Sequence, residues 1–352
     1  MKFFFVFIFS LIVASVAFGQ ASNIILETDM ESDMDDAAAL AMLHAMADNN
    51  ECKILAVMHN TSDKYGVGMI DVINTYYSRP DIPIGSYKKN DAYSWYFGSK
   101  KMFAKVIATS SKYGNDIVSR KDAPSALVVY KDVLSGMPEK SVVIVSVGWT
   151  TNLRDLLKDP EGNKLIIERV NKLVLMGGSW YPPDSASNRI QMNLLGNQVI
   201  KPAYESGKYV VENWPTPIVF SGLVGKAVRA GSVLEITPEH NPVRKAYKIG
   251  FLNWGADKIK DYHTADLTTV LFAVRGESEY WKLHTKGTPR IILKADDWSP
   301  ENPAENQYLR WNTIWDSNRD SDHAFLRLAV EPEKVSSVIE SLLIKPPKGI
   351  TN

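Results

Sequence analysis

The sequence predicts an α/β protein whose core is an open, mainly parallel sheet with helices on both faces. Six apolar runs of strand length alternate with longer stretches of helical pattern. The runs are rich in Val, Ile and Leu without a regular polar alternation, which is typical of strands buried on both faces. Alternation of strands with helices favours parallel strands joined by helical crossovers.

The expected elements follow this order along the chain. The strands are residues 23–28, 53–60, 141–148, 171–178, 216–222 and 290–295. The helices are residues 35–47, 66–78, 125–135, 151–158, 198–211, 266–274 and 332–343. The polar and aromatic stretch 296–322 is interpreted as a long, irregular surface excursion. Residues 20–352 are therefore expected to form a single domain, which is close to the upper size of one hydrophobic core.

Residues 1–19 have the layout of a secretory signal peptide. Lys2 precedes a long apolar run, and this run ends at the small residues Ala17 and Gly19. The run is shorter than the roughly 20 residues that a membrane-spanning helix needs. We therefore expect cleavage and a secreted or periplasmic protein with no membrane attachment.

Charge and cysteine content narrow the class of protein further. Lys plus Arg number 40 and Asp plus Glu number 40, so the formal net charge is zero. This balance argues against a nucleic-acid partner and a polybasic membrane surface. Cys52 is the only cysteine, so no internal disulfide can form, and its place in an apolar run predicts a buried, inert thiol.

Polar residues and glycines follow successive predicted strands. Asp29 follows the first, Asn60 the second, Gly148 the third, Gly177–Gly178 the fourth and Ser221–Gly222 the fifth. Open α/β sheets bind ligands outside the carboxyl ends of their strands. We expect these five stretches to meet at one edge of the sheet.

The segment ETDMESDMDD, residues 27–36, concentrates carboxylates at that edge. Each carboxylate repels its neighbours unless a cation lies among them. Asp29, Glu31 and Asp33 fit the first positions of an EF-hand loop, but Met34 and Leu40 stand where that loop needs Gly and Glu. A phosphatase-type Asp-x-Asp nucleophile is a second alternative, and its Lys and Thr partners are not recognisable.

A metal site where the first strand meets the next helix is the third alternative. Asp35 and Asp36 begin a strongly helical stretch, where the positive end of the helix dipole favours carboxylates. A helix cap alone would need only one Asp. A hard cation such as Ca²⁺ binds six to eight oxygens and would remove the repulsion.

Here the sequence resembles a known family. IILETDMESDMDDAAAL is similar to the signature of inosine–uridine-preferring nucleoside hydrolases, in its longer form D-T-D-x-G-x-D-x-D-D-A, with Glu27 for the first Asp. ILAVMHNTSD, VIVSVGWTTNLRDLL, KLVLMGGS and DLTTVLFAV resemble later family stretches in the same order. The resemblance covers most of residues 23–275 and implies a Rossmann-like nucleoside hydrolase fold.

The resemblance implies a Ca²⁺ site and assigns its residues. Asp29 matches the metal ligand that also acts as the general base. Asp36 matches a bidentate metal ligand, and Asp35 matches the neighbour that contacts the ribose hydroxyls. Val147 lies where a backbone carbonyl binds the metal, and Asp266 matches the last carboxylate ligand, although an N-cap is its plain alternative.

Further positions match residues that bind the sugar. Asn60 matches a ribose-binding Asn, and Asn193 resembles the Asn of the E-F-N triplet, with Gln191 in place of its Glu. Asn188 and Asn197 are alternative equivalents of Asn193. Met176 is expected to pack against the sugar, with core packing as its alternative.

One departure concerns the leaving group. Many family members have a His directly before the residue that matches Asp266, and that His helps to protonate the departing base. This chain has Ala265 at that position, and His263 lies two residues earlier.

The resulting hypothesis is a secreted, Ca²⁺-dependent N-ribohydrolase that cleaves nucleosides or a related N-riboside through a metal-activated water, and that forms homo-oligomers as relatives do. The alternatives are a non-catalytic nucleoside- or ribose-binding protein and a hydrolase of another glycosidic substrate on the same scaffold.

Overall fold

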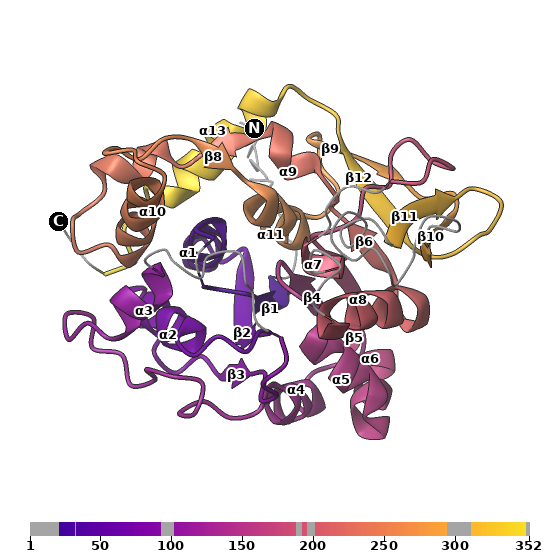
Figure 1. The fold of residues 1–352 in the computed structure, drawn as a ribbon, viewed down its shortest axis with the longest axis horizontal. Helices are drawn as coiled ribbons and strands as arrows, with labels where there is room; N and C mark the ends of the chain where they lie inside the picture. Colours follow the sequence, from indigo (N-terminus) through magenta and orange to yellow (C-terminus); the bar gives the residue numbers. More distant parts are fainter. Residues whose placement is uncertain are drawn as a thin grey trace, which may run out of the picture.

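The computed structural model describes residues 21–31, 33–92, 102–187, 192–195, 201–293 and 311–349. Eight strands form one sheet in the order β3–β2–β1–β4–β5–β6–β12–β9 (Figure 1). Neighbouring strands are parallel except β12 and β9, which run antiparallel. The strands are β1 (Ser22–Thr28), β2 (Cys52–His59), β3 (Ile84–Ser86), β4 (Val142–Ser146), β5 (Val170–Leu175), β6 (Ile218–Phe220), β9 (Trp281–His284) and β12 (Ala324–Leu328). The predicted fold class is confirmed.

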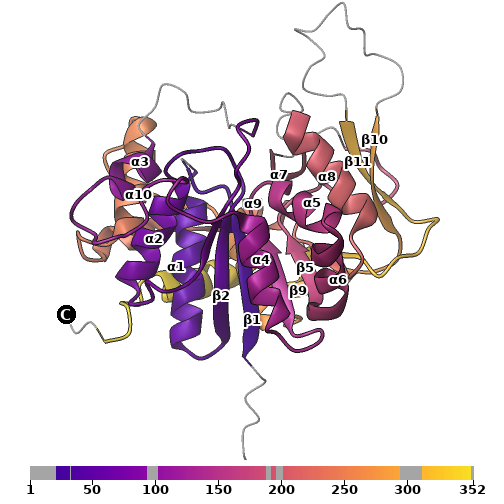
Figure 2. The same ribbon diagram turned by 90° about the horizontal axis from the view of Figure 1, so that it is seen from below.

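Helices cover both faces of the sheet (Figure 2). One layer contains α1 (Asp35–Asp48), α2 (Gly66–Tyr76), α3 (Phe103–Ala108), α10 (Pro242–Asn253), α11 (Ala265–Arg275) and α13 (Pro332–Leu343). The other contains α4 (Ala126–Ser135), α5 (Thr151–Lys158), α6 (Pro160–Arg169), α7 (Met192–Leu195) and α8 (Lys201–Asn213).

The central strands supply both hydrophobic cores. Ile24 and Leu26 of β1 belong to the core under α1 and α11, whereas Ile25 belongs to the core under α4 and α5. All three side chains are fully buried. Successive residues of a strand point to opposite faces, so the middle of a strand between two helical layers is apolar on both faces.

Several short elements lie outside these layers. The helix α9 (Val224–Ala227) follows β6, and the 3₁₀ helix η2 (Ser232–Ile236) precedes α10. The strands β7 (Arg229–Ala230) and β8 (Tyr262–His263) form a small antiparallel pair. The β8 strand leads directly into α11, so it helps to place the start of that helix.

Most predicted helices are present, and two stretches of the sequence behave differently from the prediction. Residues 290–295 do not add a strand to the buried sheet, because β10 (Thr288–Leu293) pairs antiparallel with β11 (Trp311–Asp316) in a separate two-stranded sheet. The interpretation of 296–322 as irregular surface is wrong for β11. Trp315 is fully buried against Phe325 and Trp180, so an aromatic side chain anchors this hairpin.

The prediction missed the outer part of the main sheet. The strands β3, β9 and β12 are three to five residues long and lie toward its edges, and such short runs carry little periodic signal. Cys52 is 5% exposed and burial raises its pKa to about 12, as expected for an inert thiol. No helix in the described part of the chain is both long and apolar enough to span a membrane.

Candidate functional site

The acidic segment lies where the carboxyl ends of β1 and β4 meet the first turns of α1 and α11. Asp29 directly follows β1, and Gly148 lies two residues beyond β4. A Cβ atom at Gly148 would come within 2.4 Å of the Asp29 backbone nitrogen. Only glycine allows these two loops to approach so closely.

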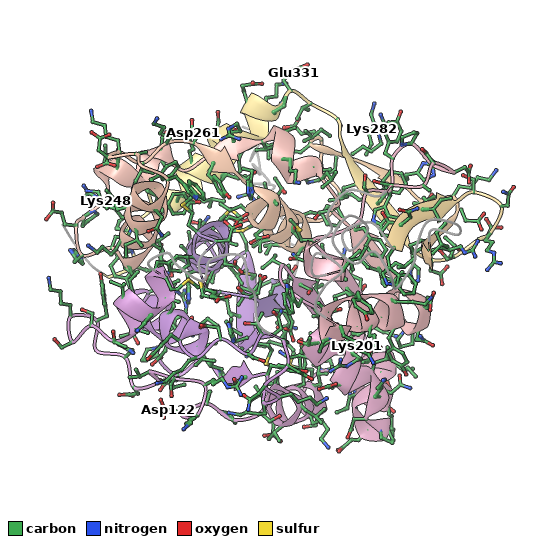
Figure 3. The ribbon with its side chains drawn as sticks, viewed as in Figure 1. Asp122, Lys201, Lys248, Asp261, Lys282 and Glu331 are labelled. Atoms are coloured by element: carbon green, nitrogen blue, oxygen red, sulfur yellow. The ribbon has the colours of Figure 1, made fainter. Side chains whose placement is uncertain are left out.

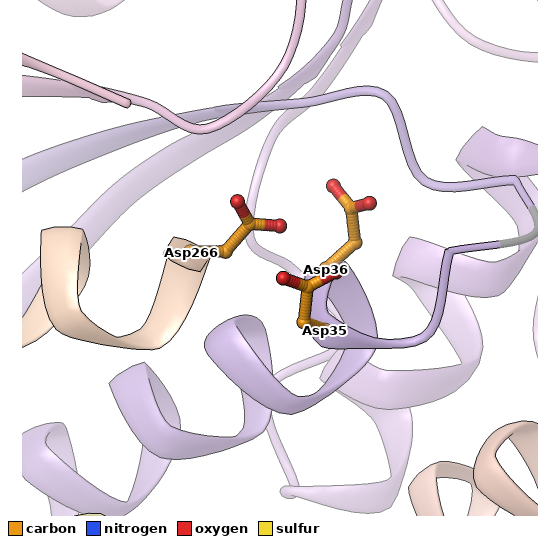
Figure 4. Close-up of side chains that lie close together, drawn as sticks. All are labelled: Asp35, Asp36 and Asp266. Atoms are coloured by element: carbon orange, nitrogen blue, oxygen red, sulfur yellow. The ribbon is translucent and has the colours of Figure 1, made fainter. Parts of the chain in front are cut away.

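Three carboxylates come together from two helices. Asp35 and Asp36 are the first residues of α1, and Asp266 lies in the first turn of α11 (Figure 4). One oxygen from each lies within 4.8 Å of the others, and the three residues are at most 4% exposed. Both helices direct the positive ends of their dipoles at this point. We call Asp35, Asp36 and Asp266 the carboxylate cluster.

Burial and mutual repulsion make this cluster electrostatically unfavourable by itself. Burial raises the pKa of Asp36 well above its usual range, and the charges of Asp29 and Asp35 raise it further. Burial likewise raises the pKa of Asp266, with further contributions from Asp35 and Asp36. Thr28 donates a hydrogen bond to Asp36, which offsets only part of this cost.

Asp29 and Asp33 border the cluster. Burial raises the pKa of Asp29 to about 7, the charge of Asp35 also raises it, and a hydrogen bond with Asp36 lowers it. Asp33 Oδ1 is buried with no hydrogen-bond partner among the described residues. Convergent carboxylate oxygens with an unsatisfied acceptor nearby are the donor set that a hard divalent cation requires. The residues present therefore fit a metal ion.

The structure brings part of the predicted ligand set together. Asp36 and Asp266 lie together, and Asp35 is beside them although the resemblance assigned it to the sugar. Asp29 is not one of the three grouped carboxylates, but its charge acts on both Asp36 and Asp266. The assignment of individual ligands remains a proposal.

Val147, Asn193 and Met176 form a second group at the same edge. The Asn193 side-chain amide donates to the Val147 carbonyl oxygen, which the resemblance assigned to the metal. The same amide nitrogen is 3.2 Å from Met176 Sδ. The short helix α7 thus brings a predicted sugar-binding residue onto the loop after β4. Gln191, Asn188 and Asn197 lie outside the described residues.

Asn60 is held by Glu27 instead of facing open space. Its side-chain nitrogen donates to Glu27 Oε2 at 3.0 Å, and its side-chain oxygen accepts from the Trp149 backbone at 3.1 Å. Tyr130 and Asn152 also donate to the Glu27 carboxylate, at 2.9 and 3.2 Å. We call Glu27, Asn60, Asn152 and Tyr130 the Glu27 network. A ribose contact by Asn60 stays a prediction.

Sequence reasoning missed two members of this network. Asn152 stands inside GWTTNL, a stretch that resembles the family, yet nothing in its spacing indicated a contact with Glu27. Tyr130 lies within α4, more than a hundred residues from Glu27, and its helix carries no distinguishing motif. Only an unusual Glu at the end of a buried strand could have suggested that such partners exist.

His263 reaches the cluster from β8. Its Nδ1 is 3.3 Å from Asp35 Oδ2, and its ring lies 3.9 Å from that of Tyr262, centroid to centroid. The side chain is 26% exposed, so it lies between the buried carboxylates and solvent. Ala265, at the position of the usual family His, is buried in the first turn of α11.

The aromatic residues in the segments that follow β3, β4 and β5 divide into two kinds. Trp149 is fully buried and Trp180 is 2% exposed, so both pack in the interior. Tyr181 is 57% exposed. Trp95 and Tyr96 lie outside the described residues. Among the described members of this set only Tyr181 has an exposed ring, and the Arg327 guanidinium lies 3.9 Å from the centroid of that ring.

No protein-family model and no curated protein matches this chain in sequence. Solved structures do match. The plant nucleoside hydrolase PpNRh1 superposes with a TM-score of 0.60 at 15% identity, over 92% of this chain and 99% of its own. An inosine–uridine-preferring nucleoside hydrolase from Bacillus anthracis superposes with a TM-score of 0.61 at 14% identity, over 92% of this chain and 99% of its own. The type III effector protein XopQ, solved with adenosine diphosphate ribose, superposes with a TM-score of 0.58 at 13% identity, over 93% of this chain and 94% of its own. The chain therefore has the nucleoside hydrolase fold.

Proposed function

We propose that this chain is a secreted or periplasmic N-ribohydrolase that uses a bound divalent cation, Ca²⁺ by its all-oxygen donor set, to cleave nucleosides or related N-ribosides. The carboxylate cluster carries the proposal, because it gathers Asp35, Asp36 and Asp266 at the ligand-binding edge of the sheet. The nucleoside hydrolase fold over 92% of the chain supports the same reaction class. Neighbours whose names specify nucleosides or adenosine diphosphate ribose favour a riboside as the substrate.

Asp35, Asp36 and Asp266 would hold the cation, with Asp29 completing the site. A divalent cation held there would make water more acidic and would help to orient neighbouring hydroxyl groups. Asp29 accepts the proton of the attacking water. The attack breaks the bond between the anomeric carbon and the base nitrogen, through an oxocarbenium-like transition state.

The departing base needs a proton, and the chain offers His263 for this role. It lies 3.3 Å from Asp35 and is partly exposed, so a substrate in the site could contact it. A general acid of this kind contributes about 10²- to 10⁴-fold to a rate. Met176 and Asn193, which touch each other beside Val147, would line the sugar.

The direct test is hydrolysis of a nucleoside panel by the mature protein with added Ca²⁺, measured as release of reducing sugar. We expect release from at least one nucleoside and loss of that release after chelation. Failure with every nucleoside, although Ca²⁺ binds, would refute the proposal.

A non-catalytic nucleoside- or ribose-binding protein is the second candidate. It is favoured by Ala265 in place of the usual His and by the internal hydrogen bonds of Asn60. The two candidates differ in their response to Asp29→Ala. In a hydrolase the rate falls while affinity changes less, whereas a binding protein shows nucleoside binding by calorimetry with no turnover before or after the change.

A further inference from the structure

A cationic cavity lies between α3, the residues after it and α10. Its volume is about 460 Å³, and none of its lining residues belongs to the carboxylate cluster. One wall is held to the acidic segment through the Ala104 backbone nitrogen, which donates to the Glu31 carbonyl oxygen at 3.3 Å. The other wall packs there through Gly250, where a Cβ would come within 2.8 Å of Met34 Sδ.

Positive charge dominates the lining. Lys112, Arg244, Lys245 and Lys248 all contribute, against one carboxylate, Glu239. Figure 3 shows Lys248 at the outer edge of α10. Because the whole chain has no net charge, this excess is a local feature of the cavity.

The carboxylates nearby leave part of this charge uncompensated. Glu235 Oε1 lies 3.6 Å from Arg244 and 3.4 Å from Lys248, so one acid serves two cations. Within the described part of the chain, no carboxylate lies within ion-pair distance of Lys112 or Lys245. Two exposed lysines that line the cavity therefore have no carboxylate partner in the described part of the chain.

Arg244 provides a fixed donor among these flexible lysines. Its Nη1 donates to the Thr237 carbonyl oxygen, and its side chain is only 13% exposed. Its Nε is buried with no hydrogen-bond partner among the described residues. Because Nε is buried, only the Nη end of this guanidinium is open to a ligand, and its planar donors match the oxygens of a phosphate group better than an ammonium group does.

The remaining wall is apolar. Ile107 is 1% exposed, Val106 is 41% exposed and Tyr113 is half-buried. An inorganic anion would not use this surface. A ligand with an organic part joined to a phosphate would contact both kinds of wall.

We propose that this cavity is a binding site for a phosphate-bearing small molecule, held by Lys112, Arg244 and Lys245 with its organic part against Val106 and Tyr113. It is separate from the riboside site and does not depend on the hydrolysis proposed above. The repulsive carboxylate cluster would disfavour the same anion, so the two sites select ligands of different charge.

The test is calorimetric titration of the metal-free mature protein with inorganic pyrophosphate, AMP and adenosine at low ionic strength. We expect pyrophosphate and AMP to bind here, and the double variant Lys112→Ala/Lys245→Ala to weaken both by about tenfold or more. AMP tighter than pyrophosphate identifies an organic phosphate as the ligand class, and equal affinities identify the phosphate alone.

The matched control is Lys164→Ala/Lys201→Ala, which removes the same charge from exposed lysines on α6 and α8. Lys201 lies across the molecule from Lys248 in Figure 3. No binding of either phosphate up to about 10 mM, or equal weakening in both double variants, overturns the proposal. Lys245→Glu, at an exposed position, replaces the first double variant if that variant fails to fold. Asp36→Asn should leave pyrophosphate binding intact, which separates this site from the riboside site.

Discussion

The Glu27 network and the carboxylate cluster are two buried acidic regions that begin eight residues apart on the chain, at Glu27 and Asp35. Three neutral donors, from Tyr130, Asn60 and Asn152, satisfy the carboxylate of Glu27. In the carboxylate cluster three acids lie within 4.8 Å of one another, and His263 approaches one of them, Asp35, at 3.3 Å. Hydrogen bonds from neutral groups offset part of the cost of burying one acid, although burial still raises the pKa of Glu27 to about 8. Several adjacent acids need a positive charge.

The difference indicates separate roles. The Glu27 network ties β1 to the loops after β2 and β4, so it fixes the scaffold of the site. The carboxylate cluster is unfavourable alone and becomes favourable when a cation binds, which suits a functional centre. Changes in the two regions should therefore affect different properties of the protein.

The largest expected effect is on turnover. Asp36→Asn should lower the rate of nucleoside hydrolysis by about 10³-fold, because the amide holds a cation poorly. The same change should stabilise the metal-free protein, since it removes one of the repelling charges. Steady-state assays and chemical unfolding measure the two quantities, and Asp132→Asn on the exposed side of α4 is the control. An unchanged rate would exclude Asp36 from the site.

Glu27→Ala should lower the stability of the folded protein, whereas Asp36→Asn acts mainly on turnover. It leaves the buried donors of Asn60, Asn152 and Tyr130 without an acceptor, and we expect a loss of about 3 kcal/mol in the free energy of unfolding. Glu27→Gln keeps the shape and should cost less. Tyr130→Phe, which deletes one donor, should cost about 1 kcal/mol. Equal stability of Glu27→Ala and the wild type in urea unfolding would contradict the scaffold role.

Cation binding should also distinguish the carboxylate cluster from the Glu27 network. Ca²⁺ at about 100 times its dissociation constant should add about 2.7 kcal/mol to the stability of the folded state. The gain should disappear in Asp36→Asn and persist in Glu27→Gln, as seen by thermal unfolding with and without the ion. If Ca²⁺ stabilises both variants equally, it binds elsewhere.

The smallest effect concerns a buried group on α1, eight residues beyond Asp36 on the same helix. His44 is fully buried, and burial lowers its pKa to about 3. A lowered pKa means that the unfolded state binds more protons between about pH 3 and 6.5, so this contribution to stability declines as the pH falls through that window. From pH 7 to 5.5 the wild type should lose about 1 kcal/mol more than His44→Gln. An identical pH dependence in both proteins would contradict this.

Much of the fold could be predicted because its central elements follow local patterns. The limits of α5 and α13 match the predicted 151–158 and 332–343, since their apolar faces and boundary residues are encoded within each segment. The hairpin of β10 and β11 could not be placed, because a buried Trp315 in a polar stretch depends on contacts with Phe325 and Trp180 from distant segments.

The sequence by itself determined where the central strands and helices lie along the chain, because apolar periodicity is a local property. It also determined that carboxylates are concentrated after the first strand, because charge density is local as well. Only the tertiary structure decided which acids meet. Asp266 joins Asp35 and Asp36 because β8 and α9 position the start of α11, and Glu27 is satisfied by Tyr130 from α4. Contacts of this kind depend on packing between segments far apart in the chain, and no short stretch of sequence encodes them.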